Sequence, residues 1–480
     1  MKTLVWFRGK DLRMADHGPL TAAAAAGDVI PLFVLDPYFF APSRAAELPH
    51  RMQFLLESLE SLAANLAHVG SRLVVVAGKS TEVVPRVAAK LGVDRVVAHR
   101  WCEPFARERD TRVGAALRVP FELFEGETLV PPGTLRTGGG TPYSVFTPFS
   151  RAWAKAFVPS KPLPAPKRLP AVPADLGLDE VSVPTLASLG LTKNEGLQPG
   201  GERNGRKRLD TFVTSVASRY HLQRDRMDVD GTSRLSADLK FGTVSARTIH
   251  GKVTDVLAEG GKGNAEALRV FVNELVWREF THHTIWDRPE LLEVPFRDDF
   301  RRFPYVEDPA GWTAWVRGAT GYPVVDASAR QLLASGFVHN RARMISASFL
   351  TKHLLVSYRD GEAHYMKWLT DGDWAQNDAG WQWSSGSGCD AQPYFRVFNP
   401  ITQGEKFDPE GDYVRRWVPE LSKLPAKVIH KPWEAAPEIL RAAGVTLGRT
   451  YPMPIVDHAK ARARFLAVAT KHLRGGGADA

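Results

Sequence analysis

The sequence predicts two domains of different class: an N-terminal α/β domain with a parallel, Rossmann-like sheet, and a C-terminal all-α domain. Three features of the 480-residue chain lead to this prediction. Short apolar runs alternate with amphipathic stretches near the start, a proline-rich segment follows, and apolar residues then recur at helical spacing. The length exceeds that of one ordinary hydrophobic core and agrees with two or three domains.

Four apolar runs define the predicted sheet. They occupy residues 3–7, 29–36, 72–78 and 95–99, and the amphipathic stretch 52–70 has helical spacing. We assign this α/β domain to residues 1–130. No strand is followed by the GxGxxG pattern of dinucleotide-binding proteins, so the strands leave the ligand of this domain open.

A linker and a helical domain follow. Residues 158–174 contain six prolines within looser sequence, so we assign 131–205 to an interdomain linker that runs over the surface. Beyond it, the stretches 268–286 and 344–369 carry apolar residues at helical spacing, without alternating strands. We therefore predict a helical domain over residues 206–475.

Composition narrows the function classes. The formal net charge of +9 favours a polyanionic partner such as nucleic acid, although an arginine-rich composition gives many unrelated proteins a similar charge. Cys102 and Cys389 are too few for a disulfide framework and neither lies in a CxxC motif, so we predict no bound metal and a reducing compartment. No apolar run approaches the roughly 18 residues of a membrane span, which predicts a cytoplasmic protein.

Polar motifs interrupt the predicted helices at three places. The hydroxyl-rich GTSRLS at 231–236 suits phosphate oxygens at a helix start, or is an ordinary helix cap. The motifs at 339–344 and 371–378 combine carboxylates, amides and guanidinium groups. Such groups form structural ion pairs, or bind the edges of a heteroaromatic ring system.

Aromatic residues gather near the C-terminus of the helical region. Trp381 and Trp383 precede a ring cluster at 394–398, and Trp277 shares a helical face with Glu274. Core packing is the ordinary explanation for tryptophan in an apolar helix. In a basic protein, surplus rings also suit stacking on unpaired bases.

With these motifs in order, the chain resembles the photolyase/cryptochrome family, specifically class I cyclobutane pyrimidine dimer photolyases. The resemblance is carried by WFRGKDLRMAD, YSVFTPFSRAW, GTSRLSADLKFG, NELVWREF, TGYPVVDASARQL, HNRARMISASFL, DGDWAQND, GWQWSSGS and PYFRVFNPITQGEKFD. It implies an antenna-binding α/β domain and a helical domain that holds FAD in a U shape. The implied activity is a carbon–carbon lyase reaction, in which excited reduced FAD gives an electron to a flipped-out dimer in DNA. The implied setting is a monomer in a bacterial cytoplasm, at the nucleoid when bound to DNA.

The resemblance also assigns site residues. Those at the lesion are Glu274, Trp277, Asn340, Met344, Asn377 and Trp383. Those that bind FAD are Tyr220, Thr232, Ser233, Arg234, Leu235, Ser236, Arg278, Asn340, Arg343, Asp371, Gly372, Asp373 and Asn377, with Arg343 paired to Asp371 and Asn377 facing flavin N5. Those at the DNA are Arg224 and Gln403, together with Glu274, Trp277, Asn340 and Trp383.

Electron transfer to the flavin departs from the family pattern. Relatives use three tryptophans, of which Trp381 is the flavin-proximal one, and Tyr358 and Tyr305 occupy the other two positions. Tyrosine is harder to oxidise and must release its proton, so we expect slow photoreduction or a detour. Core packing is the favoured role of Trp374 and Trp315, and both also lie at positions that suit a detour.

The antenna and the exact activity have alternatives. Phe105 and Ala106 occupy the positions of the Asn-Glu pair that binds a folate antenna, so deazaflavin is favoured over no antenna, and either over folate. A cryptochrome-like photoreceptor would commonly carry Asp at Asn377, and a (6-4) photoproduct photolyase would carry His at Met344. Both residues therefore favour dimer repair.

Overall fold

The computed structural model describes residues 1–258 and 262–475. These residues form two compact units. The first comprises Met1–His221, Ser233–Pro289 and Thr370–Ala375. The second comprises Leu222–Thr232, Glu290–Leu369 and the described chain from Gln376 onward.

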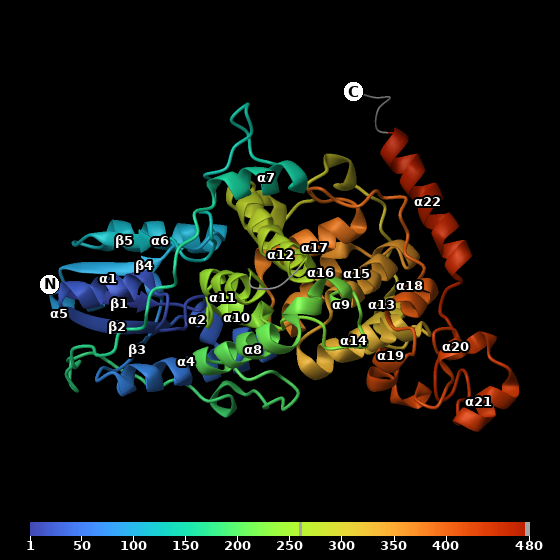
Figure 1. The fold of residues 1–480 in the computed structure, drawn as a ribbon, viewed down its shortest axis with the longest axis horizontal. Helices are drawn as coiled ribbons and strands as arrows, with labels where there is room; N and C mark the ends of the chain where they lie inside the picture. Colours follow the sequence, from blue (N-terminus) through green and yellow to red (C-terminus); the bar gives the residue numbers. More distant parts are fainter. Residues whose placement is uncertain (259–261, 476–480) are drawn as a thin grey trace. The chain divides into compact units, whose positions relative to one another are not determined.

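The first unit contains a five-stranded parallel sheet (Figure 1). Its strands are β1 (Lys2–Phe7), β2 (Asp28–Leu35), β3 (Val74–Ala77), β4 (Arg95–His99) and β5 (Phe121–Phe124), in the order β3-β2-β1-β4-β5. The register pairs Val5 of the central strand with Pro31 on one side and Val97 on the other. The four predicted strands are confirmed, and β5 was not predicted.

Helices cover both faces of this sheet. They are α1 (Gly18–Ala26), α4 (Pro49–His68), α5 (Ser80–Leu91) and α6 (Pro104–Ala116). Because side chains alternate along a strand, Val5 and Phe7 pack in one core with α1 and α4. Leu4 and Trp6 pack in the opposite core with α5 and α6. The α/β class is therefore as predicted.

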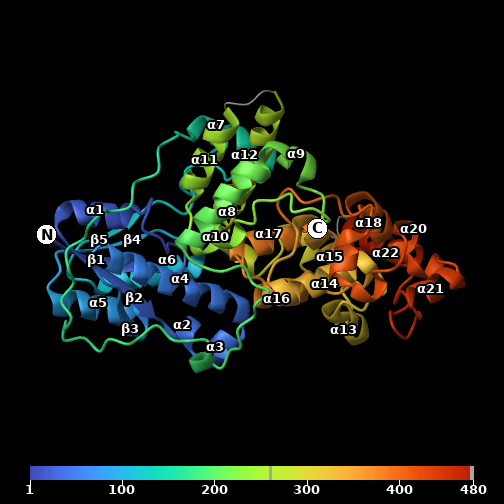
Figure 2. The ribbon, with the colours of Figure 1, turned by 60° about the horizontal axis from the view of Figure 1, so that its bottom comes forward.

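Further helices complete the first unit and appear together in Figure 2. They are α7 (Phe146–Ala156), α8 (Glu202–Ser215), α10 (Ser236–Phe241), α11 (Ala246–Ala258) and α12 (Lys262–Asp287). Between α7 and α8 the chain is irregular apart from the short helix Ala187–Leu189. The main chain at Leu169 and Val181 donates hydrogen bonds to Val69 and Val75 of the α/β part.

The second unit is helical, as predicted, and its described residues include no named strand. Its main helices are α13 (Pro309–Arg317), α14 (Pro323–Ser335), α15 (Asn340–Ser348), α16 (Tyr358–Trp368), most of α17 (Trp374–Ser385), α18 (Pro400–Phe407), α19 (Asp412–Trp417), α20 (Ala426–Ile429), α21 (Pro437–Ala443) and α22 (His458–Gly475). One core includes residues from Tyr322 to Tyr451. Across the described chain, no helix has the length and apolar character needed to cross a membrane.

Candidate active site

A cavity of about 680 Å³ lies within the second unit. Met344 on α15, Trp383 on α17 and Gln403 on α18 line it. The structure thus brings together three residues that the sequence predicts for the lesion or the DNA. The volume falls within the roughly 300–1,000 Å³ typical of small-molecule sites.

Charged and aromatic side chains complete the cavity wall. They are Asp225, Arg341, Arg396, Phe398, Lys406 and Phe407. Arg341 donates a hydrogen bond to Asp225 at 2.8 Å, and its guanidinium carbon lies 4.3 Å from the centre of the Phe407 ring. Three cationic side chains against one carboxylate favour an anionic ligand.

Asn340, also predicted for this site, begins α15 and is exposed. Its side-chain amide lies 3.8 Å from the sulfur of Met344. Asn340 is not among the residues that line the cavity, so its predicted contacts with FAD and DNA stay predictions.

Trp381 is buried in an aromatic array of the second unit. Its ring centre lies 6.1 Å from Trp315 and 5.1 Å from Tyr365. Trp315 stacks on Trp312 at 5.4 Å, and Trp312 is half-buried. Gly361 makes room for Trp381, because a Cβ there would lie 2.2 Å from the indole. The array connects Trp381 through Trp315 to a ring that reaches solvent.

Tyr358 and Tyr305 belong to the same unit but hold their protons tightly. Burial raises the pKa of Tyr358 above its ordinary value, and the nearby Asp378 raises it further. Burial also raises the pKa of Tyr305, with a smaller contribution from Tyr358. Because oxidised tyrosine releases its phenolic proton, these surroundings oppose hole transfer through either ring.

Asn377 lies on α17 beside two buried carboxyl groups. Its side-chain amide donates to the main-chain oxygen of Glu362 at 3.1 Å. Burial raises the pKa of Glu362 to about 7, against the effect of Arg359. Burial also raises the pKa of Asp378, and Glu362 adds to that rise. The residue predicted to face flavin N5 therefore has two neighbouring carboxyl groups whose pKa values are raised.

The predicted lesion residues of the first unit lie on α12. Trp277 packs face to face on Phe146 of α7, with ring centres 3.6 Å apart and planes 3° apart. Trp277 and Glu274 are both half-buried and lie one helical turn apart. The buried Glu279 accepts hydrogen bonds from Trp153 Nε1 at 2.6 Å and from the main-chain nitrogen of Val130 at 3.0 Å, which fixes α12 against α7.

The predicted phosphate-binding turn, whose residues from Ser233 onward belong to the first unit, has unusual backbone geometry. Arg234 has a φ of +55°, in the left-handed region that non-glycine residues rarely adopt. Leu235 follows with φ −93° and ψ 6°, and its main-chain nitrogen donates to Ser233 Oγ at 3.4 Å. Successive N–H groups in such a turn form a concavity that suits an anion. Buried Tyr220, also predicted to bind FAD, packs edge-on against Phe271 at 5.3 Å.

Asp373 belongs to a buried charge cluster of the first unit. Lys10 Nζ lies 3.1 Å from Asp373 Oδ2 and also contacts Glu103 and Glu127. His282 Nε2 lies 3.4 Å from Glu127 Oε1 and 3.9 Å from Asp373 Oδ1. Burial acts to raise the pKa of Asp373, but Lys10 and His282 hold it well below its usual range. We call these five residues the Lys10 cluster.

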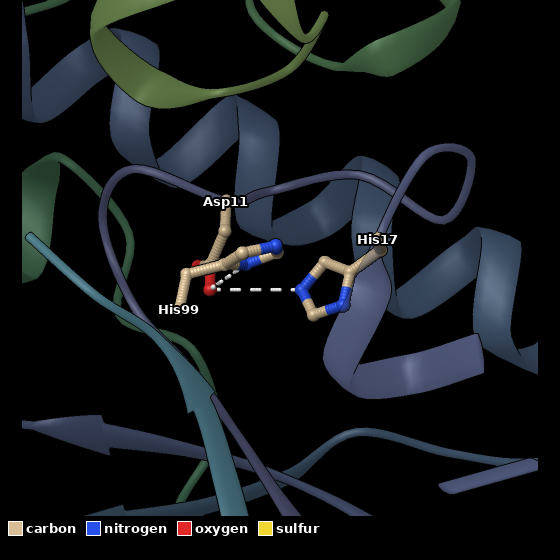
Figure 3. Close-up of side chains that lie close together, drawn as sticks. All are labelled: Asp11, His17 and His99. Carbon is tan, nitrogen blue, oxygen red and sulfur yellow. Dashed lines mark hydrogen bonds and ion pairs between the residues drawn. The ribbon is translucent and has the colours of Figure 1, made fainter. Parts of the chain in front are cut away.

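A second buried group joins Asp11, His17 and His99 (Figure 3). Asp11 Oδ2 lies 3.2 Å from His99 Nδ1 and 3.6 Å from His17 Nε2, a spacing that would suit a metal. However, His17 Nδ1 accepts a hydrogen bond from the main-chain nitrogen of Leu20. A neutral imidazole that accepts at Nδ1 carries its proton on Nε2, which leaves no lone pair there for a metal. Burial lowers the pKa of both histidines, so the rings are neutral and the group is a hydrogen-bonded carboxylate.

The predicted site residues are divided between the two units. The first unit holds Tyr220, Ser233, Arg234, Leu235, Ser236, Glu274, Trp277, Arg278, Asp371, Gly372 and Asp373. The second holds Arg224, Thr232, Tyr305, Asn340, Arg343, Met344, Tyr358, Asn377, Trp381, Trp383 and Gln403. Their contacts with FAD or DNA stay predictions.

Sequence analysis missed several residues of these sites. The position of Lys10 could have indicated a site, because a lysine shortly after a buried parallel strand lies at the sheet edge where ligands bind. Arg396 and Lys406 alternate with rings in PYFRVFNPITQGEKF, a pattern that suits nucleic acid. The stack of Phe146 on Trp277 joins positions too far apart in sequence for periodicity to reveal.

A family model described as DNA photolyase matches residues 3–167, and one described as the FAD binding domain of DNA photolyase matches residues 271–471. A protein of Agrobacterium fabrum named deoxyribodipyrimidine photo-lyase is 40% identical over 472 residues, which cover 97% of this chain and 96% of the relative.

Two solved structures resemble the whole chain. A bacterial class III photolyase from Agrobacterium tumefaciens has a TM-score of 0.91 and 39% identity, and the match covers 98% of each chain. A cryptochrome from Synechocystis has a TM-score of 0.86 and 30% identity, and the match covers 97% of this chain and 99% of that one. The family models, the full-length relative and the matching fold show together that this chain belongs to the photolyase/cryptochrome family.

Proposed function

We propose that this protein is a deoxyribodipyrimidine photo-lyase that repairs cyclobutane pyrimidine dimers in DNA by light-driven electron transfer. The observation that carries the proposal is the cavity that Met344, Trp383 and Gln403 share with three cationic side chains. Its rings suit stacking on the two linked pyrimidines of a flipped-out dimer, and its cations suit the flanking phosphates. A dimer stacks and pairs weakly, so flipping it out costs less than the few kcal/mol that normal bases require.

FAD is the cofactor that the matched FAD-binding domain supports. The chain's own groups fit it: the turn at Arg234 suits phosphate, and Asp373 is a buried carboxylate able to accept hydrogen bonds from a ring edge. We assign Asn377 to flavin N5 and Glu274 to a hydrogen bond with the dimer. When bound in its reduced form, FAD supplies on excitation the electron that splits the dimer. The protein positions both partners and excludes water.

A second, antenna chromophore is part of the proposal, with deazaflavin favoured over folate. Phe105 stacks on Tyr38 with ring centres 5.9 Å apart, and Ala106 is buried. Neither offers the polar groups that a folate-binding Asn-Glu pair supplies. The absorption spectrum of the purified protein distinguishes the two chromophores.

The class and setting are also proposals. The sequence motifs favour class I, whereas the similar structure from Agrobacterium tumefaciens is a class III photolyase. We propose a monomer in a bacterial cytoplasm that joins the nucleoid when it binds damaged DNA. We also keep the predicted domain boundaries at 1–130, 131–205 and 206–475.

A dimer-repair assay tests this function. Chemically reduced protein is mixed with oligothymidine that contains cyclobutane dimers, and the ultraviolet absorbance of the bases is followed in blue light and in darkness. We expect absorbance to recover only in the light. Repair of (6-4) photoproducts instead would indicate the other photolyase activity. Light-driven flavin changes without any repair would indicate a cryptochrome-like photoreceptor.

The assignment of Asn377 has its own test. Asn377→Asp places a carboxyl group where we assign flavin N5, so the flavin redox state that persists in air should change. If visible spectra of the two proteins coincide through reduction and reoxidation, Asn377 does not face N5.

A further inference from the structure

We propose that Lys10, which follows β1, is a positioning residue for FAD: it fixes the Asp373 carboxylate and, through Glu127, supports Arg278. The inference rests on the proposed function, because Asp373 and Arg278 are the FAD-binding residues concerned. The Lys10 ammonium group already contacts three carboxylates, so we assign it no contact with a ligand.

The placement of Lys10 follows from the sheet topology. The strand order β3-β2-β1-β4-β5 reverses its direction of growth between β1 and β4. The carboxyl ends of parallel strands at such a switch point form the crevice in which α/β proteins bind ligands. Here Lys10 follows β1, Glu103 follows β4 and Glu127 follows β5, so an ammonium group of the protein occupies that edge.

Asp373 is held from two sides. Lys10 Nζ contacts its Oδ2 at 3.1 Å, and His282 Nε2 lies 3.9 Å from its Oδ1. The side chains of Lys10 and Asp373 are only 3% and 6% exposed, so solvent screens their attraction little. A buried ion pair that loses one partner leaves the other charge uncompensated. Lys10 is therefore the leading charge partner of Asp373 and, together with His282, acts on its carboxylate from two sides.

Lys10 remains a cation although its ammonium group is buried. Burial acts to lower the pKa of Lys10, but Asp373, Glu103 and Glu127 raise it well above its usual range. Lys10 also leads the charges that lower the pKa of Asp373, ahead of His282, Lys240 and Arg278. The ionised pair persists throughout the neutral pH range.

Arg278 draws support from the same cluster. Its guanidinium donates to the main-chain oxygen of Glu127 at 2.8 Å, and the side chain of Glu127 contacts Lys10. The main-chain nitrogen of Cys102 donates to Glu127 Oε2 at 2.8 Å, which fixes that side chain. Supporting groups of this kind set the accuracy with which a site holds its ligand.

The test is a thermodynamic cycle on FAD affinity. Apoprotein is titrated with FAD, and binding is followed by flavin fluorescence and by the visible spectrum. The variants are Lys10→Met, Asp373→Asn and their combination. Lys2→Met, at the start of β1, is the control because among the described residues Lys2 Nζ donates one hydrogen bond, to the main-chain oxygen of Leu91 at 3.0 Å.

We expect Lys10→Met and Asp373→Asn each to weaken FAD binding about tenfold or more, as loss of a supporting residue does in other buried sites. In the Asp373→Asn background, Lys10→Met should reduce FAD affinity much less, because the carboxylate that Lys10 fixes is already absent. Lys10→Arg, which keeps the charge, should restore part of the affinity and the spectrum of bound FAD. Lys2→Met should bind as the parent does.

Equal losses from Lys10→Met in both backgrounds would overturn the inference, as would normal affinity in Lys10→Met beside weakened binding in Asp373→Asn. Normal affinity in Asp373→Asn would overturn it together with the assignment of Asp373 to FAD. The repair function is tested separately, by the dimer-repair assay. If Lys10→Met does not fold, Lys10→Gln, which keeps a hydrogen-bond donor without the charge, enters the same cycle.

Discussion

The Lys10 cluster of the first unit and the aromatic array around Trp381 in the second unit are both buried, but they differ in what holds them together. Lys10 is surrounded by carboxylates, so removal of one charge strands the others. Trp381, Trp315 and Trp312 carry no charge and pack against one another, and Trp315 Nε1 also donates a hydrogen bond to Ser346 Oγ at 3.0 Å.

The difference matches two needs of the proposed reaction. A cofactor must be held in one position, which charged, hydrogen-bonded groups do well. An electron route must accept and release a hole without large rearrangement, which neutral tryptophans suit better than tyrosines that must release a proton. We therefore propose that charge sets the position of the cofactor in the first region and that rings carry electrons in the second.

The largest effect should come from the charge cluster. Lys10→Met leaves three buried carboxylates without their shared cation, so we expect the unfolding free energy to fall by about 3–5 kcal/mol. Urea unfolding measures this, with Lys2→Met as the control. A change as small as that of the control would show that the cluster does not stabilise the fold.

A pH dependence should follow from Glu362 in the second unit. Its pKa rises on folding to about 7 because of burial, so the folded state binds more protons than the unfolded chain. Its contribution is fully present below the unfolded pKa of about 4.3 and is lost as pH rises through about 7, by at most about 4 kcal/mol.

Glu362→Gln should therefore flatten the decline of the urea midpoint between about pH 4 and about pH 8, an interval that spans the range from about 4.3 to about 7. The exposed Glu438→Gln should leave the decline unchanged. An identical pH profile for Glu362→Gln and the parent would contradict the raised pKa.

Recognition of the dimer should depend on rings more than on charge. Trp383→Ala and Trp277→Ala should each cost about 1–3 kcal/mol of specific binding to dimer-containing DNA. Lys406→Ala should weaken binding to damaged and undamaged DNA equally and should reduce the salt dependence of that binding. Filter binding at two salt concentrations separates these effects. Unchanged dimer affinity in both tryptophan variants would exclude stacking at these positions.

The smallest effect should be on the electron route. The Trp381–Trp315–Trp312 contacts favour a detour, so Trp315→Phe should slow photoreduction of oxidised flavin while Trp374→Phe should not. Laser-flash absorbance with an external electron donor measures the rate. Tyr358→Trp combined with Tyr305→Trp should accelerate it.

The detour would be contradicted if Tyr358→Phe lost fast photoreduction while Trp315→Phe kept it. The tyrosines would then be part of the route and not a break in it. Equal rates in the parent and Trp315→Phe would assign Trp315 to core packing alone.

The sequence predicted the fold class and four apolar strands because burial on both faces gives near-continuous apolar runs. It missed β5, since Phe121–Phe124 is half-buried and interrupted by Glu122, whereas the equally short β3 is almost entirely buried and apolar. Motifs predicted that Met344, Trp383 and Gln403 serve one site, and the cavity brings them together. The Lys10–Asp373 pair was beyond reach, because it joins positions 363 residues apart that neither periodicity nor local spacing relates.

The most direct measurement compares repair and photoreduction in one variant, Trp381→Phe. In the proposed reaction, reduced flavin starts repair without the aromatic array, whereas oxidised flavin depends on that array to become reduced. We predict that chemically reduced Trp381→Phe repairs dimers in blue light as well as the parent does, while its photoreduction is almost lost. Absence of light-dependent repair in the reduced parent would contradict the proposed function. Loss of repair only in the reduced variant would contradict the separation between repair and the aromatic array.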